Sequence, residues 1–428
     1  MRFFISAVPM FDANMAVNAY RMKTRSGDKL MGAAEDFRML GGELLAPALE
    51  CVKDIGVEPF AGGRDFFVSI TKYQLLVGMP LNMRIPPESF VCSIDSESLT
   101  DNAVYAKLGI LKRNKYRLAI EGLTDVISKD TMFKVFDFVQ LSYESPHFEI
   151  DLKELQPYLS RTKLIITDVP NRATYDLLAK INGVMLCGDF YSQPITEGIK
   201  EISPLKINAL NLIRQINDES FDLVDASRTI ERDPSLSISL LRFINNINTN
   251  RSRKIESIQG AVAILGQKEV RKWATIAISI SVAEDRPGEI TRLSLIRAKF
   301  AENLAPAYEM AIKSGTLFIA GLFSLLDIIL ERPMDEAVKE IAADEDIRAA
   351  LVEQKGPLAD VLSLIYAYER ADWHEASINM VRNNVDIEAI SQAYLDALFW
   401  YRQLLDTIDR EDDDELAEGT PESTEGES

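Results

Sequence analysis

Short β-rich runs alternate with amphipathic helical stretches over the first two hundred residues of the chain. Repeated strand–helix units predict a parallel sheet with helices outside it. About seven strands in one domain favour closure into an α/β barrel of the TIM type, because closure removes exposed sheet edges. The helical stretches lie at 97–112, 128–135, 151–159 and 171–181. The expected strands are Phe3–Val8, Phe66–Ile70, Phe90–Ile94, Tyr116–Ile120, Phe138–Leu141, Leu164–Thr167 and Val184–Cys187.

From Ser203 onward the β pattern ends and helical spacing dominates, which predicts an all-α domain. Asp233-Pro234 and Ser257 are typical helix starts, because Asp and Ser cap free N–H groups and Pro fits the first turn. Gly266 is a plausible stop for the helix that starts at Ser257. Further helices are expected at 294–313, 317–330, 335–341, 358–368, 373–381 and 387–408.

These changes divide the chain into a barrel at 1–200, a helical domain at 201–408 and a tail at 409–428. The first boundary should lie near Pro194–Leu205, where two prolines and a glycine interrupt the pattern. The segment from Glu411 to Ser428 has nine acidic residues and no basic ones. Because it has almost nothing apolar to bury, we expect the tail to be disordered.

The whole chain of 428 residues carries a net charge of −19 and has a pI of about 4.7. This acidity argues against broad electrostatic binding to nucleic acid or anionic membranes. Without the tail the charge is −10, so a local basic face stays open. A basic patch near a helix–turn–helix-like run is the candidate, either as an interaction surface or as an ordinary solvated face. It consists of Arg251, Arg253, Lys254, Lys268, Arg271 and Lys272.

Three cysteines at long spacings, with no C-x-x-C motif, predict reduced thiols in a cytoplasmic protein. The apolar run Leu317–Leu330 is shorter than the ~20 residues of a membrane span and contains Asp327, so we expect no membrane insertion. Phosphate-binding glycine loops and nucleophile elbows are absent from the sequence. His147 and His374 stand far apart without a partner motif and are expected at the surface.

Carboxylates at barrel strand ends are the remaining candidates for divalent-cation binding, since those ends form the active face of such barrels. The candidates are Glu121, Asp168 and Asp189, although turn or capping roles explain isolated acids more simply.

Both halves together resemble the bacterial EAL and HDOD domain signalling proteins. In the barrel half, 7–12 is similar to "RQPIFD", 116–120 to the start of "YRLALDDF", and 188–194 to the end of "QGYYFSKP". In the helical half, 232–245 is similar to "DPSLSYKLLRLINS", 255–266 to "ISSIRQALVLLG", and 270–273 to "LRRW". The helical strings are the more specific ones.

An active EAL domain hydrolyses cyclic di-GMP with metal ions held by carboxylate and amide side chains, and here that ligand set is replaced. The signature Glu-Ala-Leu falls at Arg21-Met22-Lys23, and the paired Asp-Asp falls at Glu121-Gly122. The resemblance therefore implies a degenerate barrel without phosphodiesterase activity. The other ligand positions hold Ser69, Ser93, Gln140, Thr167, Asp168 and Cys187.

The helical half is related to HD phosphohydrolases, whose metal site needs a His-Asp pair. Ser324-Leu325 stands at the position of that pair, and Asp327 alone cannot hold a catalytic metal. We therefore expect no enzyme activity and no cofactor. The expected function is a non-enzymatic regulator that binds unidentified signalling proteins, with homo-oligomerisation open. The alternatives are an inactive cyclic di-GMP sensor, with Arg21, Lys23 and Arg25 near phosphates, and a weak nucleic-acid-binding regulator.

Overall fold

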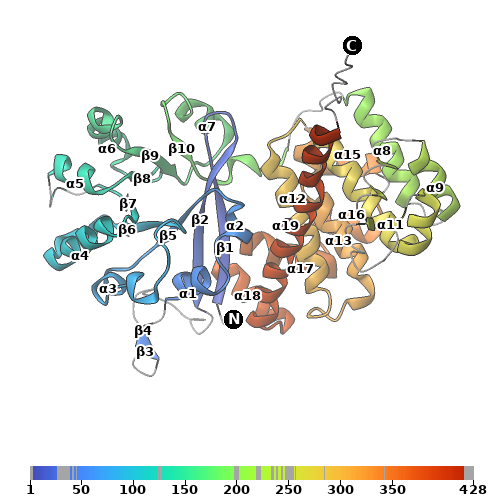
Figure 1. Cartoon of the computed structure of the whole chain (residues 1–428). Helices are drawn as coiled ribbons and strands as arrows, with labels where there is room; N and C mark the ends of the chain where they lie inside the picture. Colours follow the sequence, from blue (N-terminus) through green and yellow to red (C-terminus); the bar gives the residue numbers. More distant parts are fainter. Residues whose placement is uncertain are drawn as a thin grey trace, which may run out of the picture.

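A closed eight-stranded β-barrel forms the N-terminal half of the computed structural model, and a helical domain forms the rest (Figure 1). The barrel order is β1-β10-β9-β8-β7-β6-β5-β2. The structure describes residues 3–26, 39–40, 43–44, 46–123, 125, 128–196, 202–217, 223–232, 236–237, 240–241, 244–245, 255, 257–283, 285–341 and 343–418.

All seven expected strands are present, within one to three residues of their predicted ends. Strand β6, for example, buries four of its five residues, because helices cover one face of a barrel strand and the packed interior covers the other. The barrel strands are β1 (Phe3–Phe11), β2 (Val17–Ser26), β5 (Asp65–Ser69), β6 (Val91–Asp95), β7 (Arg117–Glu121), β8 (Phe138–Ser142), β9 (Lys163–Thr167) and β10 (Met185–Leu186). A separate ribbon pairs β3 (Met39–Leu40) with β4 (Glu43–Leu44).

Two features of the barrel differ from the sequence-based expectation. Strand β1 runs antiparallel to both of its neighbours, so only the other seven strands are parallel. Strand β2 was not among the expected strands, because charged residues such as Arg21 and Lys23 interrupt its apolar pattern. It is held by a long antiparallel ladder to β1, from Phe3 opposite Ser26 to Phe11 opposite Val17.

Short helices on the outside of the barrel follow its strands (Figure 1). Three of them begin at a side-chain cap: the Thr71 side chain accepts from Gln74 N at α3, Asp101 from Ala103 N at α4, and Asn171 from Thr174 N at α7. These helices are α1 (Pro47–Asp54), α2 (Glu58–Ala61), α3 (Lys72–Leu76), α4 (Asn102–Arg113), α5 (Lys129–Val135), α6 (Phe148–Leu155) and α7 (Arg172–Leu178).

The helical half confirms two local signals. Ser257 caps α11 by accepting a hydrogen bond from Gly260 N, and the helix is broken at Gly266, whose φ of 75° lies in the left-handed region. The expected start at Asp233-Pro234 lies outside the described residues. The helices are α8 (Pro204–Asn217), α9 (Leu223–Glu231), α11 (Ile258–Val282), α12 (Gly288–Leu304), α13 (Ser314–Leu322), α14 (Leu326–Leu330), α15 (Met334–Ala337), α16 (Glu345–Arg348), α17 (Pro357–Glu369), α18 (Trp373–Asn383) and α19 (Ile387–Glu418).

The C-terminal helix and the apolar run near residue 320 both extend beyond their expected limits. Helix α19 continues to Glu418, past residue 409, where the sequence pattern predicted a disordered tail. The apolar segment Ala311–Leu330 is long enough to cross a membrane, with a mean hydropathy of 1.7. However, 61% of its most apolar part is buried, with Leu317 and Phe318 fully covered, so core packing explains its composition.

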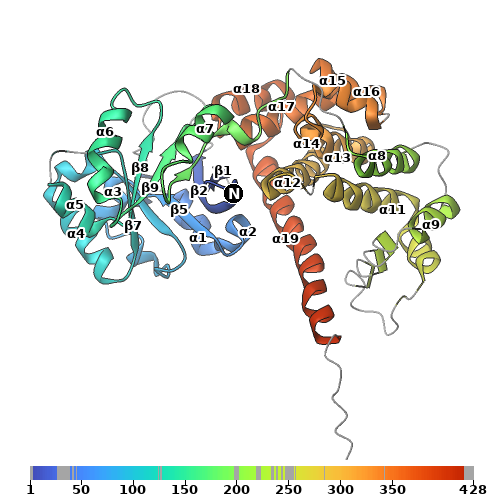
Figure 2. The same ribbon diagram turned by 90° about the horizontal axis from the view of Figure 1, so that it is seen from above.

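The two halves meet where β1 and β2 face α12, α17 and α19 (Figures 1 and 2). The ring of Phe4 stacks on that of Trp373 at 5.1 Å between centroids, and Ile5 N donates to the Tyr368 hydroxyl at 3.1 Å. The outer face of β1 is therefore covered by the helical domain, and one continuous apolar core runs through both halves.

The three cysteines are free thiols, and all of them are buried in the barrel half. Burial raises the pKa of Cys51 to about 12 and that of Cys187 to about 11, and it raises the pKa of Cys92 as well. The thiolate is the reactive form, so the native protein at pH 8 should react with a disulfide reagent far more slowly than a free thiol does. All three thiols should react at once in guanidinium chloride. Fast reaction of the native protein would contradict this prediction.

Candidate functional site

The mouth of the barrel, where the seven parallel strands end, is the first candidate site. Arg21 on β2 points its guanidinium at Glu121 on β7, with 2.9 Å between Nη2 and Oε2. The other carboxylate oxygen of Glu121 accepts a hydrogen bond from Ser69 at 2.8 Å. Of these three residues only Glu121 has a carboxylate, and that carboxylate binds both the Arg21 guanidinium and the Ser69 hydroxyl. Both charged side chains keep some exposure, 20% for Arg21 and 28% for Glu121.

The other positions of the implied ligand set also bond among themselves. The buried Gln140 donates to Ser93 at 2.9 Å. Asp168 accepts hydrogen bonds from Ser142 at 2.6 Å and from Thr167 at 2.9 Å. These polar groups form hydrogen-bonded pairs, although the buried Oε1 atom of Gln140 has no hydrogen-bond partner among the described residues.

The three acids that were candidate magnesium ligands are not brought together. Glu121 is paired with Arg21, Asp168 with two hydroxyls, and the exposed Asp189 begins a short turn of helix after β10. Among the described residues, no three His, Cys, Asp or Glu side chains are placed to hold a metal ion. His147 and His374 are exposed, as expected.

In the helical domain, the positions of the implied His-Asp pair are built into the packing. Ser324 accepts a hydrogen bond from Arg297 Nη1 at 3.1 Å and donates to the Gly321 carbonyl at 2.7 Å. Leu325 is 1% exposed. Asp327 accepts a hydrogen bond from Ile195 N at 3.0 Å, and burial raises its pKa. Asp327 thus holds the segment that joins the barrel to the helical domain.

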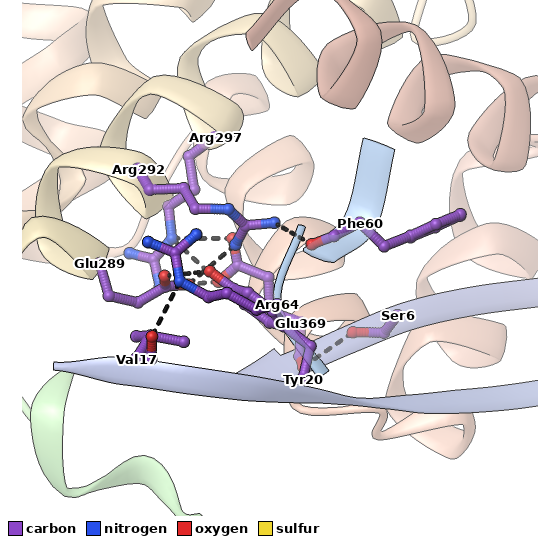
Figure 3. Close-up of polar contacts among 9 residues, drawn as sticks. All are labelled: Ser6, Val17, Tyr20, Phe60, Arg64, Glu289, Arg292, Arg297 and Glu369. Carbon is purple, nitrogen blue, oxygen red and sulfur yellow. Dashed lines mark hydrogen bonds and ion pairs between the residues drawn. The ribbon is translucent and has the colours of Figure 1, made fainter. Parts of the chain in front are cut away.

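Two buried ion pairs lie between the barrel and the helices, and sequence analysis missed both (Figure 3). Arg297 on α12 forms a forked pair with Glu369 on α17, at 2.9 Å from Nε and 2.7 Å from Nη2. Ser6 on β1 donates to the Glu369 carbonyl at 3.2 Å, so the pair is tied to the barrel. Burial alone would lower the pKa of Arg297, but the adjacent Glu369 carboxylate raises it.

The second pair joins Glu289 and Arg292 on α12 at 2.8 Å (Figure 3). Tyr20 on β2 donates its hydroxyl to Glu289 at 2.7 Å, and Arg292 donates to the Phe60 carbonyl at 3.3 Å. Burial and the Glu289 carboxylate hold the pKa of Tyr20 well above its ordinary value, so its proton stays in place. The only sequence signal was the i, i+3 spacing of Glu289 and Arg292 in an apolar helix.

The basic patch is described only in part. Arg251, Arg253 and Lys254 lie outside the described residues. The other three members, Lys268, Arg271 and Lys272, follow the break at Gly266 in α11 and line one cavity of the helical domain. Lys272 is bound to Glu302 at 2.7 Å, which fixes its ammonium group in place.

Comparison with known proteins agrees with this architecture. Residues 202–355 match the family model of the HDOD domain. The uncharacterized protein YuxH of Bacillus subtilis is 26% identical over 415 residues, covering 95% of this chain and 100% of that protein. The cyclic di-GMP phosphodiesterase CdgJ of Vibrio cholerae is 22% identical over 404 residues, covering 94% of this chain and 93% of that protein.

Solved structures that overlap with the chain include EAL domains and an HDOD domain protein of unknown function from Geobacter sulfurreducens. The latter is 12% identical and covers 49% of this chain and 93% of that protein, with a TM-score of 0.34.

Proposed function

We propose that the protein is a non-catalytic signalling protein that acts by binding other proteins. It consists of an EAL-like barrel followed by an HDOD domain at residues 202–355. The observation that carries the proposal is the ion pair between Arg21 and Glu121 in the barrel mouth. The implied family chemistry requires a metal-binding carboxylate at the position of Arg21.

Electrostatics argues against a divalent cation in this mouth. A metal that activates water for phosphodiester hydrolysis needs several oxygen ligands and a local excess of negative charge. Glu121 supplies one negative charge, and Arg21 cancels it at 2.9 Å. The hydroxyl of the neighbouring Ser69 already donates a hydrogen bond to the same carboxylate. A cation would have to break the ion pair and then share the site with the guanidinium.

The helical domain supports the same conclusion. Ser324 and Leu325 are used for packing, and Asp327 is occupied by the backbone N–H of Ile195. With both implied metal sites replaced, we expect no hydrolysis by either half, and the large folded surface fits regulation by contact. Three buried reduced thiols fit a cytoplasmic protein, where we place it.

A turnover assay tests the non-catalytic part of the proposal. We expect full-length protein with cyclic di-GMP and Mg²⁺ or Mn²⁺ to form no linear dinucleotide above a protein-free blank. The charge-restoring variant Arg21→Glu should stay inactive as well, because Ser69, Ser93 and Gln140 still replace ligands. Turnover by the unaltered protein that is lost in Glu121→Gln would overturn the proposal.

The similarity to CdgJ favours one alternative, an inactive barrel that still binds cyclic di-GMP. Calorimetry without metal distinguishes the two, and we expect no binding heat because Arg21 is engaged by Glu121. Heat without turnover would replace the proposed function with that of a nucleotide receptor.

The protein partner can be identified by capture from the native host, followed by calorimetry with the purified candidate and the full-length protein. If no purified candidate binds, regulation by protein contact is contradicted.

A further inference from the structure

A cavity of about 210 Å³ lies in the helical domain, away from the two replaced metal sites. Its walls come from the second part of α11, the end of α12, helix α13 and the segment that leads into α16. One side is apolar and includes two aromatic rings, Phe318 and Phe323, with Ile319, Ile341 and Ile347. Helix α11 contributes the cationic part of the lining, next to the Phe318 ring.

The cationic face follows from helix geometry. Lys268, Arg271 and Lys272 stand at i, i+3 and i+4, so all three project toward the same side of α11. Two acids, Glu302 and Asp344, also line the cavity. The single negative charge of Glu302 does not neutralise the cationic face, because Lys272 at 2.7 Å and Lys299 at 2.8 Å share it.

Lys272 and Lys268 differ in what they can offer to a ligand. Lys272 is fixed by Glu302 and lies 4.2 Å from the centroid of the Phe318 ring, so it forms part of the wall. Lys268 is exposed at the rim and has no ion-pair partner among the residues that the structure describes. Its ammonium is therefore the group best placed to meet an incoming anion.

We propose that this cavity binds a small organic anion, a molecule with one apolar ring or branched body and one carboxylate or phosphate group. The apolar walls take the body, and Lys268 meets the anionic group. The size agrees, since a cavity of about 150 Å³ holds one benzene ring, which leaves room here for one further small group. A cavity of about 210 Å³ is too small for a nucleic-acid duplex, whose phosphates lie along an extended surface.

Calorimetry on the full-length protein tests the proposal with four probes. Phenyl phosphate and benzoate carry both features, inorganic phosphate carries only the charge, and benzyl alcohol carries only the ring. We expect at least one of the first two to bind ten times more tightly than either of the last two. The ratio of the affinities for phenyl phosphate and benzoate shows whether the cavity prefers a phosphate ester or a carboxylate. Equal affinity of all four probes would overturn the proposal.

Charge reversal at the rim gives the sharper test. Lys268→Glu should weaken binding of the better probe at least tenfold, whereas the matched control Lys153→Glu, exposed on α6 of the barrel, should leave it unchanged. Thr316→Trp, which fills the cavity without changing its charge, should abolish binding if the far-UV spectrum and Tm show a folded protein. An equal effect of the two charge reversals, or full binding by a folded Thr316→Trp variant, would refute the site.

Discussion

Replacing Arg297 by alanine should be the most damaging single change, lowering the free energy of unfolding by about 3–5 kcal/mol. The Arg297 side chain is 8% exposed, and that of its partner Glu369 is 14% exposed. Alanine would leave the Glu369 carboxylate inside the protein without its cation, and would also remove the donor to Ser324. At 2–4 °C per kcal/mol, the Tm should fall by about 10 °C.

Calorimetry measures this loss, and two other variants separate its causes. The double variant Arg297→Met/Glu369→Met should lose much less stability than the single one, because no charge is then left unpaired. Arg348→Ala breaks ion pairs with Glu345 and Glu353, but its side chain is 41% exposed, so the change should stay below about 1 kcal/mol. Equal losses in Arg297→Ala and Arg348→Ala would show that the buried pair has no special role.

The reaction rate of the barrel thiols in Arg297→Ala shows whether loss of the ion pair also affects the barrel. Ser6 on β1 bonds to the Glu369 carbonyl, so loss of the ion pair should loosen the barrel as well as the helices. Because all three cysteines lie in the barrel half, faster thiol reaction in Arg297→Ala reports on the barrel alone. An unchanged thiol rate together with a lowered Tm would confine the damage to the helical domain.

Gly321→Ala should be the second most damaging change, because α13 crosses α12 too closely for a side chain. A Cβ at this position would lie 2.6 Å from the Arg297 carbonyl oxygen and 2.8 Å from the Ala298 Cα. Both are backbone atoms, so the two helices would have to separate. The cost of such overpacking is about 1–3 kcal/mol, occasionally more, which corresponds to a Tm lowered by several degrees.

Gly315→Ala on the same helix is the matched control for Gly321→Ala. There the new Cβ would meet only the flexible Lys268 side chain, at 3.6 Å from its Cε. Alanine is the better helix former, so stability should stay equal or rise by up to about 1 kcal/mol. Equal destabilisation by the two substitutions would mean that the close crossing of α12 and α13 does not limit the side chain at Gly321.

The sequence by itself determined the local features of this protein. Apolar runs bounded by turns located seven of the eight barrel strands, and capping chemistry located the start of α11 at Ser257 and its break at Gly266. The family resemblance also pointed to positions such as Arg21 and Ser324, where metal ligands were expected and other side chains stand. Each of these inferences depends on residues close together in the chain, or on a motif read position by position.

Only the tertiary structure decided which distant residues meet. Arg21 pairs with Glu121, Tyr20 with Glu289 and Arg297 with Glu369, across separations of 72 to 269 residues. Strand β2 depends on the same kind of contact, because its long antiparallel ladder to β1 holds a charged strand that the local pattern alone does not favour. Likewise, α11 carries its cations at a spacing visible in the sequence, but the cavity below them exists only because α12 and α13 pack there. Local propensity fixes where an element starts and ends, whereas burial and charge pairing between elements fix what its side chains do.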